Sequence, residues 1–70
     1  MSAAITVQVN GERRTLAAPV ALDALVAAVT SAPSGVAAAL NETVVPRARW
    51  SDTALAEGDR IEILTAVQGG

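Results

Sequence analysis

An alternation of apolar and polar residues opens the chain and predicts a β-hairpin. Residues 5–9, "ITVQV", alternate with a period of two and are rich in β-branched side chains, which is typical of a half-buried strand. Asn10 and Gly11 follow, a pair that favours a two-residue turn because both residues tolerate positive φ angles. We therefore expect residues 12–18 to return as the partner strand, with Leu16 pointing inward.

The apolar spacing then changes to that of a helix. Apolar residues recur at the i, i+3, i+4 and i+7 positions of one helical face: Leu22, Leu25, Val26 and Val29. Asp23 lies near the start, where a carboxylate favours the positive end of the helix dipole. This pattern predicts a helix over residues 21–30. The segment "SAPSG", residues 31–35, cannot continue it and predicts a loop.

The next segment predicts two short strands and a loop. Residues 36–45 suggest a third strand, a turn at Asn41 and Glu42, and a fourth strand that Pro46 ends because proline lacks an amide proton. By propensity alone, the alanines of this segment also allow a helix. The stretch that follows lacks alternation and predicts a loop with a short helical turn, anchored to the body by Trp50 and Leu55.

A turn at residues 57–59 leads into the last predicted strand, residues 60–67. The resulting order is ββαβββ. A helix inserted after a hairpin must cover one face of the sheet, and we expect the last strand to lie parallel beside the first. The predicted class is α+β: a ubiquitin-like β-grasp with a mixed sheet covered by one helix. We expect a β-grasp domain over residues 1–67 and a flexible Gly-Gly tail over residues 68–70.

Composition narrows the classes of function. The chain has 70 residues, 51% of them apolar, which suits one domain with a core of small aliphatic side chains. It contains no cysteine and no histidine, which excludes disulfides, thiolate nucleophiles and the commonest metal ligands. A net charge of −2 and a single aromatic residue do not favour binding of nucleic acid. The acidic residues fit no calcium-loop spacing, so we expect no metal site.

The sequence also carries no signal for export or for membrane insertion. No basic segment followed by a long apolar run marks a signal peptide, and the apolar stretches are too short to cross a bilayer. We therefore expect a cytoplasmic protein without a membrane partner.

Three stretches taken together resemble the thiamine-pathway sulfur carrier (ThiS) family. In "LNETVVPRARW" an Asn-containing turn leads into Val-Val-Pro-Arg, with Trp three residues further on. "LAEGDRIEIL" resembles the family's Gly-Asp turn before the final strand, and "VQGG" is similar to its closing Val-x-Gly-Gly. The matching positions are Asn41, Val44, Val45, Pro46, Arg47, Trp50, Gly58, Asp59, Val67, Gly69 and Gly70. The alanine-rich third strand departs from the family pattern.

This resemblance implies a protein co-substrate and not an enzyme. A partner adenylyltransferase of the ubiquitin-activating type (ThiF-like) would use ATP to adenylate the carboxylate of Gly70. Sulfur from a donor protein would then give a thiocarboxylate, and a thiazole synthase (ThiG-like) would use its sulfur for thiazole formation in thiamine biosynthesis. The resemblance implies that the carrier itself binds no cofactor.

The residue types of the tail suit that role. An α-carboxyl group with a pKa of roughly 3.3–3.7 is an anion at neutral pH and a poor acyl electrophile, so adenylation supplies the missing leaving group. Gly69 and Gly70 have no Cβ and can thread a narrow channel, and Gln68 precedes them. A frayed chain end is the ordinary alternative for such a segment. The internal motifs favour the functional interpretation.

Three further residues are candidates for partner binding: Leu64, Val67 and Arg47. If Ile61 and Ile63 face the helix, Leu64 looks outward beside alanines of the third strand, where an apolar patch suits docking. An isolated exposed leucine and a solvated arginine are the alternatives. Other functions also stay open. They are sulfur delivery for molybdopterin or cysteine synthesis, a ubiquitin-like protein modifier, and a binding module whose Gly-Gly end is accidental.

Overall fold

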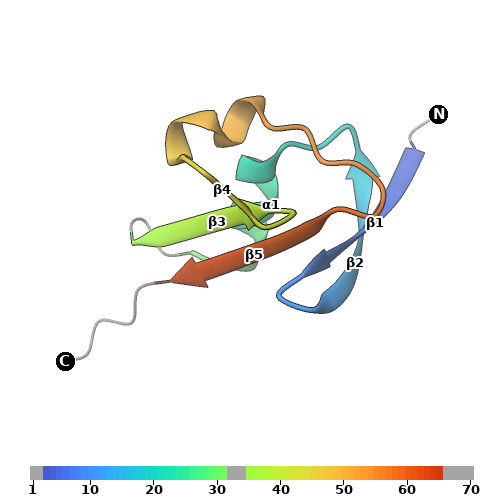
Figure 1. The fold of residues 1–70 in the computed structure, drawn as a ribbon. Helices are drawn as coiled ribbons and strands as arrows, with labels where there is room; N and C mark the ends of the chain where they lie inside the picture. The colour runs from blue at the N-terminus through green and yellow to red at the C-terminus, as the bar shows by residue number, and fades with distance from the viewer. Residues whose placement is uncertain (1–2, 32–34, 66–70) are drawn as a thin grey trace.

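A five-stranded mixed sheet with one helix across one of its faces forms the body of the protein (Figure 1). The computed structural model describes residues 3–31 and 35–65. Along the chain the elements are β1 (Ala3–Val9), β2 (Glu12–Ala18), α1 (Leu22–Val29), β3 (Val36–Leu40), β4 (Thr43–Val45), the 3₁₀ helix η1 (Arg47–Asp52) and β5 (Arg60–Thr65). The predicted ββαβββ order is confirmed, and the segment 36–45 is strand and turn, without the helix that its alanines also allow.

The sheet order is β2-β1-β5-β3-β4, so the last strand lies in the middle of the sheet. β5 runs parallel to β1, as predicted, while β1–β2, β3–β5 and β3–β4 pair antiparallel. The described part of β5 ends at Thr65, and the remaining two residues of the predicted strand lie outside the described residues.

The turns form where the sequence predicted them, and their backbone explains the residue types. Asn10 and Gly11 join β1 to β2 with φ angles of 52° and 84°. Asn41 and Glu42 join β3 to β4 with φ angles of 51° and 72°. Asparagine and glycine adopt this left-handed region readily, whereas a glutamate rarely does.

The core lies between the helix and the inner face of the sheet. Alternation within each strand sends every second side chain inward, and the helix contributes one apolar stripe. The buried hydrophobic residues are Val7, Val9, Leu22, Leu25, Val26, Ala38, Trp50, Leu55, Ile61 and Ile63. Leu16 packs against this cluster from the edge strand β2, as expected.

The loop between β4 and β5 is fastened by its tryptophan. Trp50 is only 4% exposed, and its indole Nε1–H donates a hydrogen bond to the main-chain oxygen of Val45 at 2.8 Å. Leu55 is buried as well. The predicted anchoring role of these two residues is therefore confirmed, and the predicted helical turn is η1.

Within residues 3–31 and 35–65, no helix is both long and apolar enough to cross a membrane. In the same part of the chain, no group of three or more acidic side chains is arranged to hold a metal ion.

We expect Leu25→Ala to lower the free energy of unfolding by about 2–5 kcal/mol, because it leaves a cavity in a fully packed site. Leu25 is 1% exposed. Leu64→Ala is the matched control, since the same truncation on the exposed side of β5 should change stability by about 0.5 kcal/mol or less. Urea denaturation of both variants measures the difference, and equal losses would contradict this placement of the core.

Candidate partner-docking face beside the C-terminal strand

β5 carries the chain from the middle of the sheet towards its C-terminal residues (Figure 1). Its side chains alternate between the two faces of the sheet: Ile61 and Ile63 are buried under the helix, and Leu64 is 68% exposed on the opposite face. The predicted orientation of these three residues is confirmed. The strand therefore presents a large apolar side chain to solvent just before the described chain ends.

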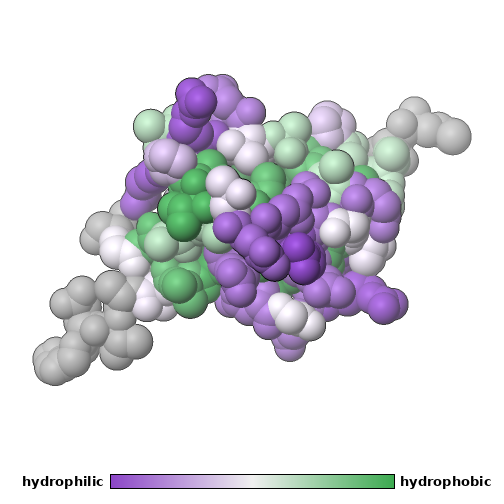
Figure 2. All heavy atoms as spheres, in the orientation of Figure 1, coloured by the Kyte–Doolittle hydropathy of each residue, from purple (hydrophilic) through white to green (hydrophobic). Residues whose placement is uncertain are grey.

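Leu64 belongs to an apolar patch on the open face of the sheet. It pairs with Ala37 of β3, and Ala39 of the same strand pairs with Val44 of β4. Val44 is 73% exposed, and it and Leu64 are the large hydrophobic residues that the described chain exposes most. We call these four residues, Ala37, Ala39, Val44 and Leu64, the Leu64 face. Figure 2 shows apolar surface gathered over β4 and the end of β5, beside a polar region.

The Leu64 face is hollowed. A shallow cavity of about 270 Å³ is lined by its four residues together with Ala38, Glu42 and Glu62. Small alanine side chains form the floor, while Leu64 and Val44 project from neighbouring parts of the sheet. A surface of this kind, apolar in the middle with carboxylates at its rim, is typical of a site where another protein binds.

The rim of this face carries charged side chains that form an exposed ion pair. Arg60 approaches Glu42 at 3.6 Å between Nη2 and Oε2, and both side chains are well exposed. An exposed pair of this kind contributes little to stability, about 0–1 kcal/mol. Its charges remain accessible to a partner.

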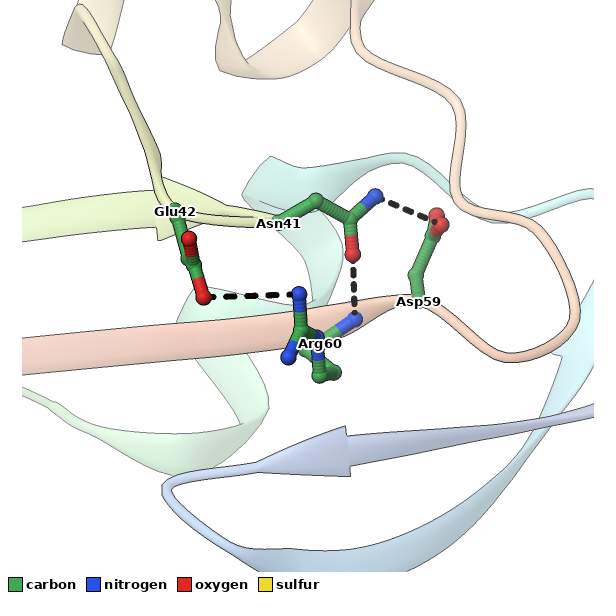
Figure 3. Close-up of polar contacts among 4 residues, drawn as sticks. All are labelled: Asn41, Glu42, Asp59 and Arg60. Carbon is green, nitrogen blue, oxygen red and sulfur yellow. Dashed lines mark hydrogen bonds and ion pairs between the residues drawn. The ribbon is translucent and has the colours of Figure 1, made fainter.

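Two turns far apart in the sequence are joined at the start of β5 (Figure 3). Arg60 donates its main-chain N–H to Oδ1 of Asn41 at 2.9 Å, and the Asn41 N–H donates to the Arg60 carbonyl at 2.7 Å. The Asn41 side chain also donates to Oδ1 of Asp59 at 3.1 Å, and Oδ2 of Asp59 accepts the N–H of Ala56 at 2.8 Å. The Asn41 turn and the Gly58–Asp59 turn are thus fastened together.

The structure places Arg47 apart from the Leu64 face. It lies at the start of η1 with its guanidinium over the Trp50 ring, 5.4 Å from the ring centroid. Arg47 and Trp50 line a separate open hollow with Asp23 and Val26 of the helix. The cation–π contact gives Arg47 a local role in covering the tryptophan. Its proposed contact with a partner stays a prediction.

Four of the predicted site residues, Val67, Gln68, Gly69 and Gly70, lie outside the described residues. The structure brings Leu64 together with the β3 alanines, as expected from the alternation of β5, and adds Val44. The sequence contained a signal for Val44: in the three-residue strand β4, alternation must send one of two adjacent valines outward.

The fold defines a ubiquitin-like β-grasp protein, a small mixed sheet covered by one helix, with an exposed apolar face. The family model of the ThiS family matches residues 7–70. The chain therefore belongs to the ThiS family, the sulfur carriers of thiamine biosynthesis.

A solved structure agrees with this assignment, and a curated relative is similar in sequence along nearly the whole chain. The crystal structure of thiamine biosynthesis protein ThiS from Geobacter metallireducens superposes with a TM-score of 0.77 at 29% identity, covering 94% of this chain and 100% of that one. An uncharacterized protein, ycf40, from Pyropia yezoensis is 32% identical over 66 residues, which is 94% of this chain and 93% of the relative.

Asn41→Gly tests the junction of the two turns. Glycine keeps the left-handed backbone of residue 41 but removes the side-chain hydrogen bonds to Arg60 and Asp59. We expect the free energy of unfolding to fall by about 1–2 kcal/mol.

The matched control is Glu42→Gly, at the next positive-φ position. It removes only an exposed ion pair and relieves a strained backbone, so stability should hold or rise. Chemical denaturation compares the two variants. A loss at Glu42 as large as that at Asn41 would contradict the assigned role of the Asn41 amide.

Proposed function

We propose that this protein is a sulfur carrier whose C-terminal carboxylate, on Gly70, is activated as an acyl-adenylate and converted to a thiocarboxylate. The observation that carries the proposal is that the match to the ThiS family extends through Gly70. The central strand β5, which precedes this end of the chain, carries the exposed Leu64. The sulfur of that thiocarboxylate would be donated to thiazole formation.

The chemistry follows from the weakness of a carboxylate as an electrophile. A Gly70 carboxylate oxygen attacks the α-phosphorus of ATP, and pyrophosphate leaves. Sulfide delivered by a donor protein then attacks the carbonyl carbon, the C–O bond to AMP breaks and a C–S bond forms. The product is a thiocarboxylate anion, and its sulfur is a soft nucleophile for the thiazole precursor.

None of these steps asks for a catalytic side chain on the carrier. The chain holds no cysteine or histidine to serve as nucleophile or general base. We therefore assign the catalysis and the ATP site to a ThiF-like adenylyltransferase, and the carrier is its protein co-substrate. A ThiG-like thiazole synthase receives the sulfur.

The carrier's own contribution is a tether and a docking surface. Five residues follow Thr65, and an extended chain spans at most about 3.3–3.6 Å per residue, so the carboxylate reaches at most roughly 18 Å beyond the described strand. In this proposal residues 1–67 are the body and residues 68–70 the tail that enters the partner's site. Gly69 and Gly70 suit a narrow entrance because they carry no side chain.

We assign the docking surface to the Leu64 face. Leu64 lies a few residues before the tail, so a partner that binds this face is placed next to the reactive end. Adenylation and sulfur transfer need the same carboxyl group in two different active sites, and we propose that the two partners use this face in turn.

The tail is tested by the intact mass of the protein purified from cells that make thiamine. Replacement of one oxygen by sulfur adds about 16 Da, a covalent change that mass spectrometry resolves. We expect this form in the native chain and its absence when Gly70 is deleted, with the fold unchanged.

Other outcomes of the same measurement separate the competing functions. Larger conjugates joined through Gly70 would show a protein modifier. A thiocarboxylate whose loss leaves thiamine synthesis intact, while molybdenum cofactor or cysteine synthesis fails, would redirect the sulfur to that pathway.

The docking surface is tested by Leu64→Asp, which places a charge in the middle of the apolar face. We expect the KM for the carrier in the adenylation reaction to rise about 10- to 30-fold, the scale of a central interface residue. Thr15→Asp is the matched control, because Thr15 lies on the same sheet face but on the far edge strand β2. Equal effects of the two substitutions would place the docking surface elsewhere.

A further inference from the structure

β5 extends beyond the strand that pairs with it on one side. Its parallel partner β1 contributes two aligned pairs, Gln8 with Arg60 and Val9 with Ile61, and the chain then turns away at Asn10. On the other side, antiparallel pairing with β3 continues as far as Thr65. The C-terminal half of β5 therefore has strand pairing along only one of its two edges.

Beyond the end of β1, the side chain of Asn10 forms the hydrogen bonds to this edge of β5. The main-chain N–H of Asn10 donates to the Ile61 carbonyl at 2.9 Å, as the last hydrogen bond of the strand pair. Its side-chain Oδ1 then accepts the N–H of Ile63 at 2.8 Å, and its Nδ2 donates to the Ile63 carbonyl at 3.0 Å. One amide side chain thus satisfies both main-chain groups of a residue 53 positions away, as a further strand residue would.

The requirements of this position select asparagine. The φ angle of 52° in the hairpin turn favours asparagine or glycine, and glycine has no amide to offer. Aspartate has the right length but no donor for the Ile63 carbonyl. Asparagine therefore serves the turn and the strand together.

Ile63 is the last described residue that is held along this edge. Along one edge of a strand, every second residue points its main-chain N–H and C=O groups outward, so after Ile63 the next residue to do so on this edge is Thr65. Within the described residues, no hydrogen bond from this side reaches the N–H or C=O of Thr65. Leu64 lies between these two residues. The Asn10 amide therefore sits at the last residue of β5 that is held along both edges, and beyond Ile63 only β3 holds the described part of the strand.

We propose that Asn10 is a positioning residue for sulfur transfer: it sets the point at which the tail leaves the body and holds Leu64 in place on the docking face. This inference rests on the proposed function. Without the amide, only β3 holds β5 beyond Ile61, and a partner must restore the order lost along the other edge when it binds. Ordering a single backbone residue costs roughly tenfold in the binding equilibrium.

The test compares Asn10→Gly with Asn41→Gly. Both asparagines have φ angles near 50°, and both hold β5 through side-chain hydrogen bonds, Asn10 at Ile63 and Asn41 at the start of the strand. Glycine keeps each turn and removes each amide, so the two variants match in backbone conformation and in the kind of hydrogen bond that is removed. Asn10→Asp is the isosteric second variant, which keeps the acceptor for the Ile63 N–H and removes the donor.

Two readouts are needed. Amide hydrogen exchange at Ile63 should become at least about tenfold faster in Asn10→Gly than in Asn41→Gly, because only the first variant frees that N–H. ATP–pyrophosphate exchange by a ThiF-type enzyme, with the carrier as the varied substrate, should show a KM about tenfold higher for Asn10→Gly with kcat unchanged. Asn41→Gly should keep the KM of the natural chain, and Asn10→Asp should fall between.

The outcomes separate the inference from the proposed function. If the natural chain supports exchange and both glycine variants show the same KM, Asn10 has only a structural role and the inference fails. If the natural chain supports no exchange, the proposed function fails, and Ile63 amide exchange alone still decides whether Asn10 holds the strand. Should Asn10→Gly not fold, Asn10→Asp decides, and a KM equal to that of the natural chain would overturn the proposal.

Discussion

The pairing of β5 between β1 and β3 is the interaction on which the rest of the structure depends. It joins the N-terminal hairpin to the C-terminal half of the chain, and it places Ile61 and Ile63 under the helix. The strand runs parallel to β1 and begins directly after the Gly58–Asp59 turn, and its C-terminal end points away from the body. With the core on one side, the same strand leaves Leu64 exposed on the other. The alternation of side chains along β5 therefore both buries the two isoleucines and exposes Leu64.

Side-chain amides complete β5 where strand pairing is missing. Asn41 receives the Arg60 N–H at the start of the strand, and Asn10 engages both main-chain groups of Ile63 near its end. Both residues lie in turns at positive φ, where a short polar side chain is tolerated and can bond to nearby backbone. The small sheet thereby fixes a central strand whose parallel neighbour pairs with it over only two aligned residues.

This arrangement suits a protein that takes part in chemistry without catalysing it. The described residues form a body whose buried polar side-chain atoms all have partners, and its open face carries an apolar hollow with carboxylates at the rim. In the proposed function, the body presents the chain end and the partner supplies the reaction. In that proposal, a preorganised body lowers the entropic cost of binding, and the cost of ordering the chain falls on Gly69 and Gly70 as they enter the partner's narrow site.

The sequence by itself determined the elements of this protein and their order. Alternation in residues 5–9, the Asn-Gly pair and the spacing of Leu22, Leu25, Val26 and Val29 are local patterns, and each produced the predicted element, with the helix ending within one residue at either side. The outward direction of Leu64 followed from the same alternation. Family motifs near residues 41–50 and 58–59 then indicated the ThiS family.

Only the tertiary structure decided which distant residues meet. The Asn10 amide reaches Ile63 across 53 positions, and Asn41 reaches Asp59 across 18. No periodicity records such contacts, because a turn asparagine has the same local sequence whether its side chain points to solvent or to another strand. The tertiary structure also decided that Val44 and Leu64 share one surface, because alternation turns a β4 valine outward but does not tell which strands are neighbours. Strand order, which is set by the packing of the whole chain, places β4 two strands away from β5 on the same open face.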